Sequence, residues 1–172
     1  MIPDPLHPAV VHFPVVLAVL VPLSALVVLL VTFRRGAGRT AWMGVVALAA
    51  LLVGSSWLAI ETGEREEDAV ESVLASEAPL ARHEDRADQF LAVAVGVLAL
   101  SLVGLASGRT GQVGRVVAVV ATLALIPAGI RVGHSGGELV YRYGAARAYS
   151  EPSAAVQADH GELSREARGP RE

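Results

Sequence analysis

Long apolar runs alternate with short polar stretches along this chain, and the pattern predicts a membrane protein built from helices. Four runs approach or exceed the roughly 20 apolar residues that a helix needs to cross a bilayer. They cover residues 9–33, 41–60, 90–107 and 113–132. Polar connections separate the runs, so that the chain can cross the bilayer in alternating directions. We therefore expect an all-α, integral membrane, antiparallel four-helix bundle.

The main polar stretch, residues 61–88, separates the second run from the third. It holds ten acids and three arginines. Apolar residues recur within it at helical spacing, at Ala69, Val70, Val73 and Leu74. This periodicity predicts a short amphipathic helix at the outer membrane surface, which Pro79 would end. His83 then follows, ahead of the third run.

Prolines, glycines and tryptophans predict local features of the spans. Pro22 lies in the middle of the first run and predicts a kink there. The glycine-rich residues 133–137 follow the fourth run and are expected to break its helix. Trp42 and Trp57 lie near opposite ends of the second run, which is typical of anchors at the membrane interface.

The composition changes after residue 144, where Ala, Glu, Arg, Ser and Gly dominate. Such a segment has too little apolar surface to fold and is expected to be disordered. We therefore divide the chain into a four-span transmembrane domain, residues 1–144, and a polar disordered tail, residues 145–172.

Arginine positions predict the orientation in the membrane. The first and third connections, which are short turns, carry five arginines, Arg34, Arg35, Arg39, Arg109 and Arg115, whereas the second connection is acidic. Arginine-rich turns remain in the cytoplasm by the positive-inside rule. Both termini and residues 61–88 are then expected outside.

The overall composition excludes several classes of functional site. The chain has 172 residues, of which 53% are hydrophobic and 18% charged, and its mean hydropathy is +0.51. It has no cysteine, which excludes disulfides, thiolate metal sites, cysteine-ligated iron–sulfur centres and covalently attached c-type haem. No His-Glu-x-x-His motif is present, which argues against a hydrolytic enzyme of the zinc-protease type. We expect a redox or binding module in a lipid bilayer, without a nucleic-acid partner.

The predicted topology brings four histidines to the outer end of the bundle. His7 and His12 begin the first span, His83 precedes the third, and His134 follows the fourth. At a helical rise of ~1.5 Å per residue, His12 and His134 lie ~33 and ~28 Å from the arginines of the turns, whereas His7 and His83 lie ~40 and ~39 Å from them. The sequence therefore predicts that His12 pairs with His134 and His7 with His83, in one site or two.

An ionisable cluster at membrane depth is costly unless it is used, and imidazole binds haem iron, Zn and Cu. One hypothesis is a haem b held by these histidines, with Arg131 near its propionates. Another is a Zn or Cu site in which histidines are joined by Glu61 or Glu138. The alternative is a non-catalytic membrane subunit, whose histidines and Arg131 form a hydrogen-bonded polar end and whose residues 61–88 dock a partner. A proton path is disfavoured because the middle of the spans has no ionisable group.

Two terminal motifs resemble those of a bacterial membrane family. They are His7-Pro8-x-x-x-His12-Phe13-Pro14 and Gly133-His134-x-Gly136-Gly137-x-Leu139-Val140-Tyr141-x-x-Gly144. The pattern, over about residues 5–144, looks like the proteins grouped as domain of unknown function 2231. The resemblance implies a four-span protein of the bacterial inner membrane without an assigned activity. Some relatives are joined to Rieske-type or cytochrome c domains, which implies a redox setting. An electron-transfer module, working with an outer-face redox protein or a quinone, is therefore our main functional expectation.

Overall fold

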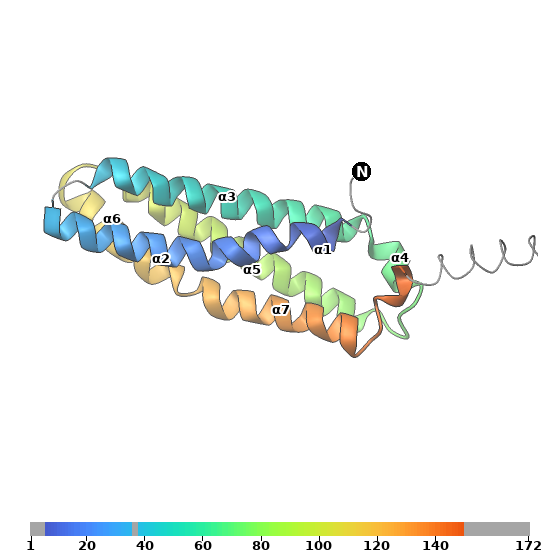
Figure 1. Cartoon of the computed structure of the whole chain (residues 1–172). Helices are drawn as coiled ribbons and strands as arrows, with labels where there is room; N and C mark the ends of the chain where they lie inside the picture. Colours follow the sequence, from blue (N-terminus) through green and yellow to red (C-terminus); the bar gives the residue numbers. More distant parts are fainter. Residues whose placement is uncertain (1–5, 36–37, 150–172) are drawn as a thin grey trace, which may run out of the picture.

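The computed structural model describes residues 6–35 and 38–149, and all regular elements in those ranges are helices. They are α1 (His7–Val10), α2 (His12–Arg35), α3 (Arg39–Glu64), α4 (Glu67–Glu71), α5 (Ala78–Val103), α6 (Gly108–Thr122) and α7 (Leu125–Tyr141). Four candidate membrane spans result, at His7–Arg34, Arg39–Glu64, Ala78–Val103 and Gly108–Tyr141. They pack side by side with alternating direction (Figure 1), which confirms the predicted all-α bundle of four spans.

The first and last spans each consist of two helices, and both interruptions lie just before a proline. The helix breaks after Val10, four residues before Pro14, and again at Leu123, four residues before Pro127. A proline has no N–H to donate, and its ring collides with the carbonyl four residues earlier. Pro22, by contrast, lies inside α2 without ending it.

Two predicted helix limits are wrong. Helix α5 already begins at Ala78, with Pro79 in its first turn, a position where the missing N–H costs nothing. Helix α4, between α3 and α5, is correspondingly short. Residues 133–137 do not break the fourth span, because α7 continues to Tyr141. In apolar surroundings a backbone N–H is best satisfied by its own helix, which outweighs the low helix propensity of glycine.

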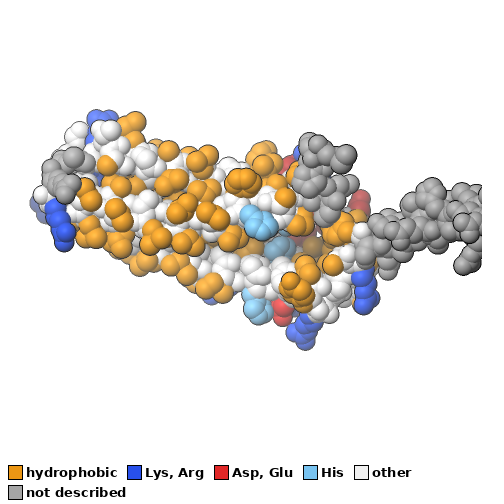
Figure 2. Space-filling model, viewed as in Figure 1, with side chains coloured by type: hydrophobic (Ala, Val, Ile, Leu, Met, Phe, Trp, Pro, Cys, Tyr) orange, Lys and Arg blue, Asp and Glu red, His pale blue; other side chains and the backbone are white. Residues whose placement is uncertain are grey.

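Small residues bring the spans close together in the core. The alanines at its centre have no exposed surface: Ala25, Ala49, Ala94 and Ala118. Larger side chains such as Leu52 and Leu125 fill the space between them. Small residues at helix contacts are typical of membrane bundles. The outer surface is apolar along the bundle (Figure 2), as lipid contact requires.

Trp42 corrects one prediction, because it is buried rather than placed at an interface. Its exposed fraction is 0%, and its indole N–H donates to the carbonyl oxygen of Ser101 at 2.8 Å. Trp57 is 58% exposed on the flank of the same helix. The two tryptophans therefore differ in role although they occupy similar places in the sequence pattern.

The chain remains packed just beyond α7. Ala145, the first residue of the predicted tail, is buried against Leu80 and Leu139. The hydroxyl of Tyr149 donates to Glu66 Oε2 at 2.7 Å. Most of the predicted tail, residues 150–172, lies outside the described residues.

Candidate functional site

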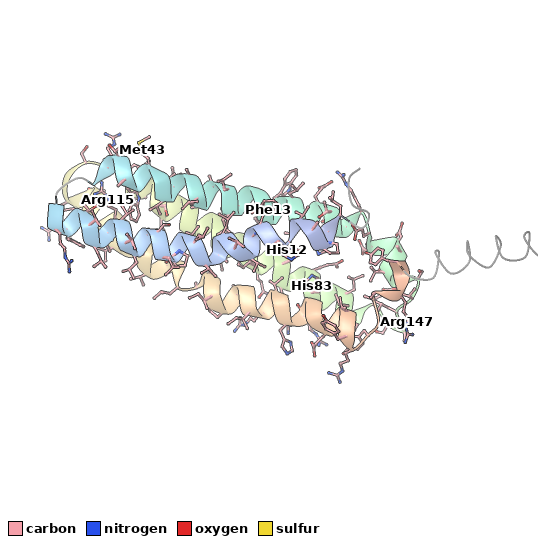
Figure 3. The ribbon with its side chains drawn as sticks, viewed as in Figure 1. His12, Phe13, Met43, His83, Arg115 and Arg147 are labelled. Carbon is pink, nitrogen blue, oxygen red and sulfur yellow. The ribbon has the colours of Figure 1, made fainter. Side chains whose placement is uncertain are left out.

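The four histidines lie toward one end of the bundle, whereas arginines occur at both ends (Figure 2). We call one the histidine end, defined by His7, His12, His83 and His134. We call the other the arginine end, defined by Arg34, Arg39, Arg109 and Arg115. Figure 3 shows His12 and His83 on the histidine side and Arg115 far from them. The prediction that four histidines share one end therefore agrees with the arrangement of the helices.

His7 links the first span to the second. It lies at the start of α1, and its Nδ1 is 2.8 Å from the carbonyl oxygen of Ala59 in α3. A carbonyl only accepts, so Nδ1 carries the hydrogen, and the lone pair of the neutral ring is on Nε2. The ring also packs on Gly63, where a Cβ would lie 3.2 Å from Nδ1.

His83 links the third span to the fourth. Its Nδ1 is 3.0 Å from the hydroxyl oxygen of Ser135 in α7. That hydroxyl donates back to its own helix, to the carbonyls of Arg131 and Val132 at 3.1 and 2.9 Å. With the hydroxyl hydrogen directed to its own helix, we assign the Ser135 oxygen as the acceptor of Nδ1–H, which leaves the lone pair of a neutral His83 ring on Nε2. Gly136 makes room for this ring, since a Cβ there would lie 3.1 Å from Cε1.

The two rings meet between the spans. Their centroids are 6.4 Å apart, and their planes are perpendicular, in an edge-to-face contact. This confirms the predicted pairing of His7 with His83. Each ring is held by an Nδ1–H bond and keeps a basic Nε2, an arrangement found in histidines that ligate metals.

Glu66 holds the start of α1, where His7 lies, by accepting backbone hydrogen bonds. Its Oε1 accepts the backbone N–H groups of Leu6 and His7 at 2.8 and 2.9 Å. Its Oε2 accepts from Tyr149. A carboxylate at the first N–H groups of α1 satisfies donors that the helix cannot. Neither Glu66 nor Ser135 was predicted as a site residue. Glu66 is one of ten acids in residues 61–88, and Ser135 is the unspecified position between His134 and Gly136 in the second motif.

His12 and His134 lie on exposed surfaces of α2 and α7. The side chain of His134 is 69% exposed, and its Nδ1 lies 3.7 Å from Glu138 Oε2. Within residues 6–35 and 38–149, His12 has no hydrogen bond or ion pair, and His12 and His134 share none. The structure therefore separates them from the half-buried pair of His7 and His83, and their predicted role as ligands stays a prediction.

Glu61 and Arg131 do not touch the histidine pair through any polar contact of the described chain. Glu61 forms an ion pair with Arg65 at 3.0 Å. The carbonyl oxygen of Arg131 accepts from Arg86 Nη1 at 3.3 Å, and both arginines line a pocket of about 240 Å³ between α5 and α7. Among the described residues, no three His, Cys, Asp or Glu side chains form a group that could hold a metal ion.

The chain is similar over most of its length to one family of membrane proteins. Residues 3–148 match the family described as "Predicted membrane protein (DUF2231)". No curated protein and no solved structure matches the chain. The matched region includes all four candidate spans and the four histidines that define the histidine end. The chain belongs to this family of predicted membrane proteins.

Proposed function

We propose that this protein is an integral membrane redox module that binds one transition-metal ion through His7 and His83. The observation that carries the proposal is that both rings donate Nδ1–H, to Ala59 and Ser135, and both keep the lone pair on Nε2. Neutral imidazoles with a fixed tautomer are ready ligands, because no proton must leave when a metal binds.

The distance between the rings suits a shared ion. Metal–nitrogen bonds of ~2.0–2.1 Å place the centroids of two imidazoles on one ion roughly 5–6 Å apart. The observed 6.4 Å is close to this range. The remaining coordination positions would be open to water or to an exogenous ligand.

The ligand set favours copper among the candidate cofactors. Structural zinc sites almost always use four ligands, whereas the pair of His7 and His83 provides two. Haem b fits less well, because the pocket beside Arg131 has about 240 Å³ and no histidine lines it, while small-molecule sites typically measure ~300–1,000 Å³. Copper bound here would supply one-electron chemistry. We place the histidine end outside the cytoplasm, because five arginines lie in or next to the two short turns at the other end. A redox protein or a quinone would exchange electrons with the histidine end there.

The test uses asparagine, whose amide nitrogen takes the place of Nδ1 while the Nε2 ligand is lost. The protein would be purified with a histidine-free tag in a His160→Asn background and titrated with Cu²⁺, Zn²⁺ and haem, followed by absorption, electron paramagnetic resonance and metal analysis. We expect one equivalent of copper. His7→Asn and His83→Asn should each weaken binding at least ~10-fold, while His12→Asn and His134→Asn should not.

The outcome that contradicts the proposal is equally specific. It fails if none of the three probes binds stoichiometrically, or if His7→Asn and His83→Asn bind as well as the parent. Stoichiometric haem that depends on the same two histidines would keep the site and replace copper by haem b. Binding that depends on His12 and His134 would move the site to the exposed pair.

A non-catalytic membrane subunit is the second candidate, and the same hydrogen bonds favour it. His7 joins α1 to α3, and His83 joins α5 to α7, so the pair would serve as a clamp on the bundle while the acidic residues 61–88 dock a partner. Under this reading alanine at either position lowers the melting temperature, asparagine does not, and no variant changes metal content.

A further inference from the structure

The arginine end contains a buried arginine that the sequence pattern presents as an ordinary turn residue. Arg115, in α6, is only 7% exposed. Its Nε–H donates to the carbonyl oxygen of Gly104 at 2.8 Å, and its guanidinium lies over the ring of Trp42, 6.0 Å from the centroid. No Asp or Glu of the described chain pairs with it.

These contacts give the guanidinium of Arg115 one hydrogen-bond acceptor and no counter-ion. The Gly104 carbonyl, at the C-terminus of α5, and the Trp42 ring each present partial negative charge to the guanidinium. Neither is an anion, and a buried charge without a counter-ion is costly. Of the guanidinium donors, only Nε–H has a hydrogen-bond acceptor within the described chain.

A second unpartnered group lies beside it. Across the described ranges, Thr32 Oγ1 is the single buried side-chain nitrogen or oxygen without a hydrogen-bond partner. Thr32 and Arg115 converge on Gly38, where an added Cβ would collide with the guanidinium and with the methyl group of Thr32. A hydroxyl left without a partner costs free energy, so the two groups together indicate an absent acceptor.

A pocket of about 260 Å³ lies next to both residues. It is lined by Leu29, Thr32, Phe33, Gln112 and Arg115. The polar groups in it are a guanidinium, a hydroxyl and an amide, which offer hydrogens and one positive charge, and no carboxylate lines it. Such a donor set fits an anion with several oxygen acceptors, and arginine pairs with phosphate through parallel hydrogen bonds.

We propose that Thr32, Gln112 and Arg115 form a phosphate-binding site at the arginine end. The ligand is either the phosphate of an anionic lipid headgroup or a free phosphate. Leu29 and Phe33 give the pocket an apolar wall, and basic pockets between membrane helices are places where anionic headgroups bind. This site is independent of the histidine pair, so each proposal can fail alone.

Trp42 provides the readout, because its ring contacts the guanidinium. In a Trp57→Phe background it is the only tryptophan. The protein, in a maltoside detergent and a phosphate-free buffer, would be titrated with short-chain phosphatidylglycerol, with phosphatidylcholine and with inorganic phosphate. We expect a saturable change in Trp42 emission. Saturation by phosphatidylglycerol alone assigns the ligand to lipid, and saturation by inorganic phosphate assigns it to the free anion.

Thr32→Val and Gln112→Leu test the site without removing Arg115, whose contacts with Gly104 and Trp42 also hold α3, α5 and α6 together. Each should weaken binding roughly 10-fold or more, the effect of one hydrogen bond to a charged group. Thr32→Val should not lower the melting temperature of the ligand-free protein, because its hydroxyl has no partner there. Thr122→Val is the matched control, since that hydroxyl bonds its own helix at 2.6 Å, and Arg109→Gln removes an exposed charge at the same end.

The proposal is overturned if no probe saturates, if phosphatidylcholine binds as tightly as phosphatidylglycerol and inorganic phosphate does not bind, or if Thr32→Val and Gln112→Leu bind like the parent. An equal loss in Arg109→Gln would also overturn it, because the attraction would then come from diffuse surface charge.

Discussion

The ring of His7 meets the ring of His83 edge-on, with centroids 6.4 Å apart, although the two residues begin different spans. Each ring is accommodated by a glycine on a neighbouring helix, Gly63 for His7 and Gly136 for His83. The pair therefore depends on small residues around it as well as on its hydrogen bonds.

Gly136→Ala tests this dependence. Its Cβ would lie 3.1 Å from Cε1 of His83, whereas Gly137 has open space around it. Alanine normally stabilises a helix by roughly 0.5–1 kcal/mol relative to glycine. We expect Gly137→Ala to raise the melting temperature in detergent and Gly136→Ala to gain less or lose stability. If metal binding is confirmed, Gly136→Ala should also weaken it, because the His83 ring must move. Equal behaviour of the two variants would contradict the packing argument.

Trp42→Phe should destabilise the arginine end. The substitution keeps an aromatic ring beside Arg115 but removes the N–H that bonds the Ser101 carbonyl. Leaving a buried polar group unpaired costs about 1–3 kcal/mol, which a thermal unfolding curve in detergent would detect. Trp57→Phe is the control, since Trp57 is 58% exposed and should change stability little. A Trp42→Phe protein as stable as Trp57→Phe would contradict this prediction.

Gly114→Ala should be among the most damaging single-methyl changes. An added Cβ would lie 2.9 Å from the Gly104 nitrogen and from the Val103 carbonyl carbon, both backbone atoms of the opposing helix end. The helices must then separate, and overpacking of this kind costs about 1–3 kcal/mol. Gly44→Ala, with nothing within 4 Å of its Cβ, should be tolerated. Comparable melting temperatures would show that α5 and α6 can part without cost.

Glu71→Gln should stabilise the protein at neutral pH. Burial first, and then repulsion from Glu77, Glu67 and Asp68, raises the pKa of Glu71 above its ordinary value of 4.5. The folded state thus holds this proton to higher pH than the unfolded chain does, and the stability linked to it is lost as pH rises through the raised pKa. The melting temperature of Glu71→Gln should exceed that of the parent at pH 7, and the difference should shrink as pH falls below 4.5. A difference independent of pH would contradict this account.

The sequence predicts the structure best for features that depend only on the lengths of the apolar runs and their order along the chain. Four apolar runs separated by polar connections determine an antiparallel bundle, because each backbone polar group in lipid must bond within its helix. The order of the spans then brings the starts of the first and third, and the end of the fourth, to one end. The shared depth of His7 and His83 follows from the helical rise.

The sequence by itself therefore determined the four spans, the family and the four-histidine end. Only the tertiary structure decided which side chains face inward, since each residue turns a helix by ~100°, and packing and the breaks before Pro14 and Pro127 set that rotation. His7 and His83 consequently meet between the spans while His12 and His134 are exposed. The same rotation buries Arg115 against Trp42, whereas residue counts at the turns could not distinguish Arg115 from an exposed turn arginine.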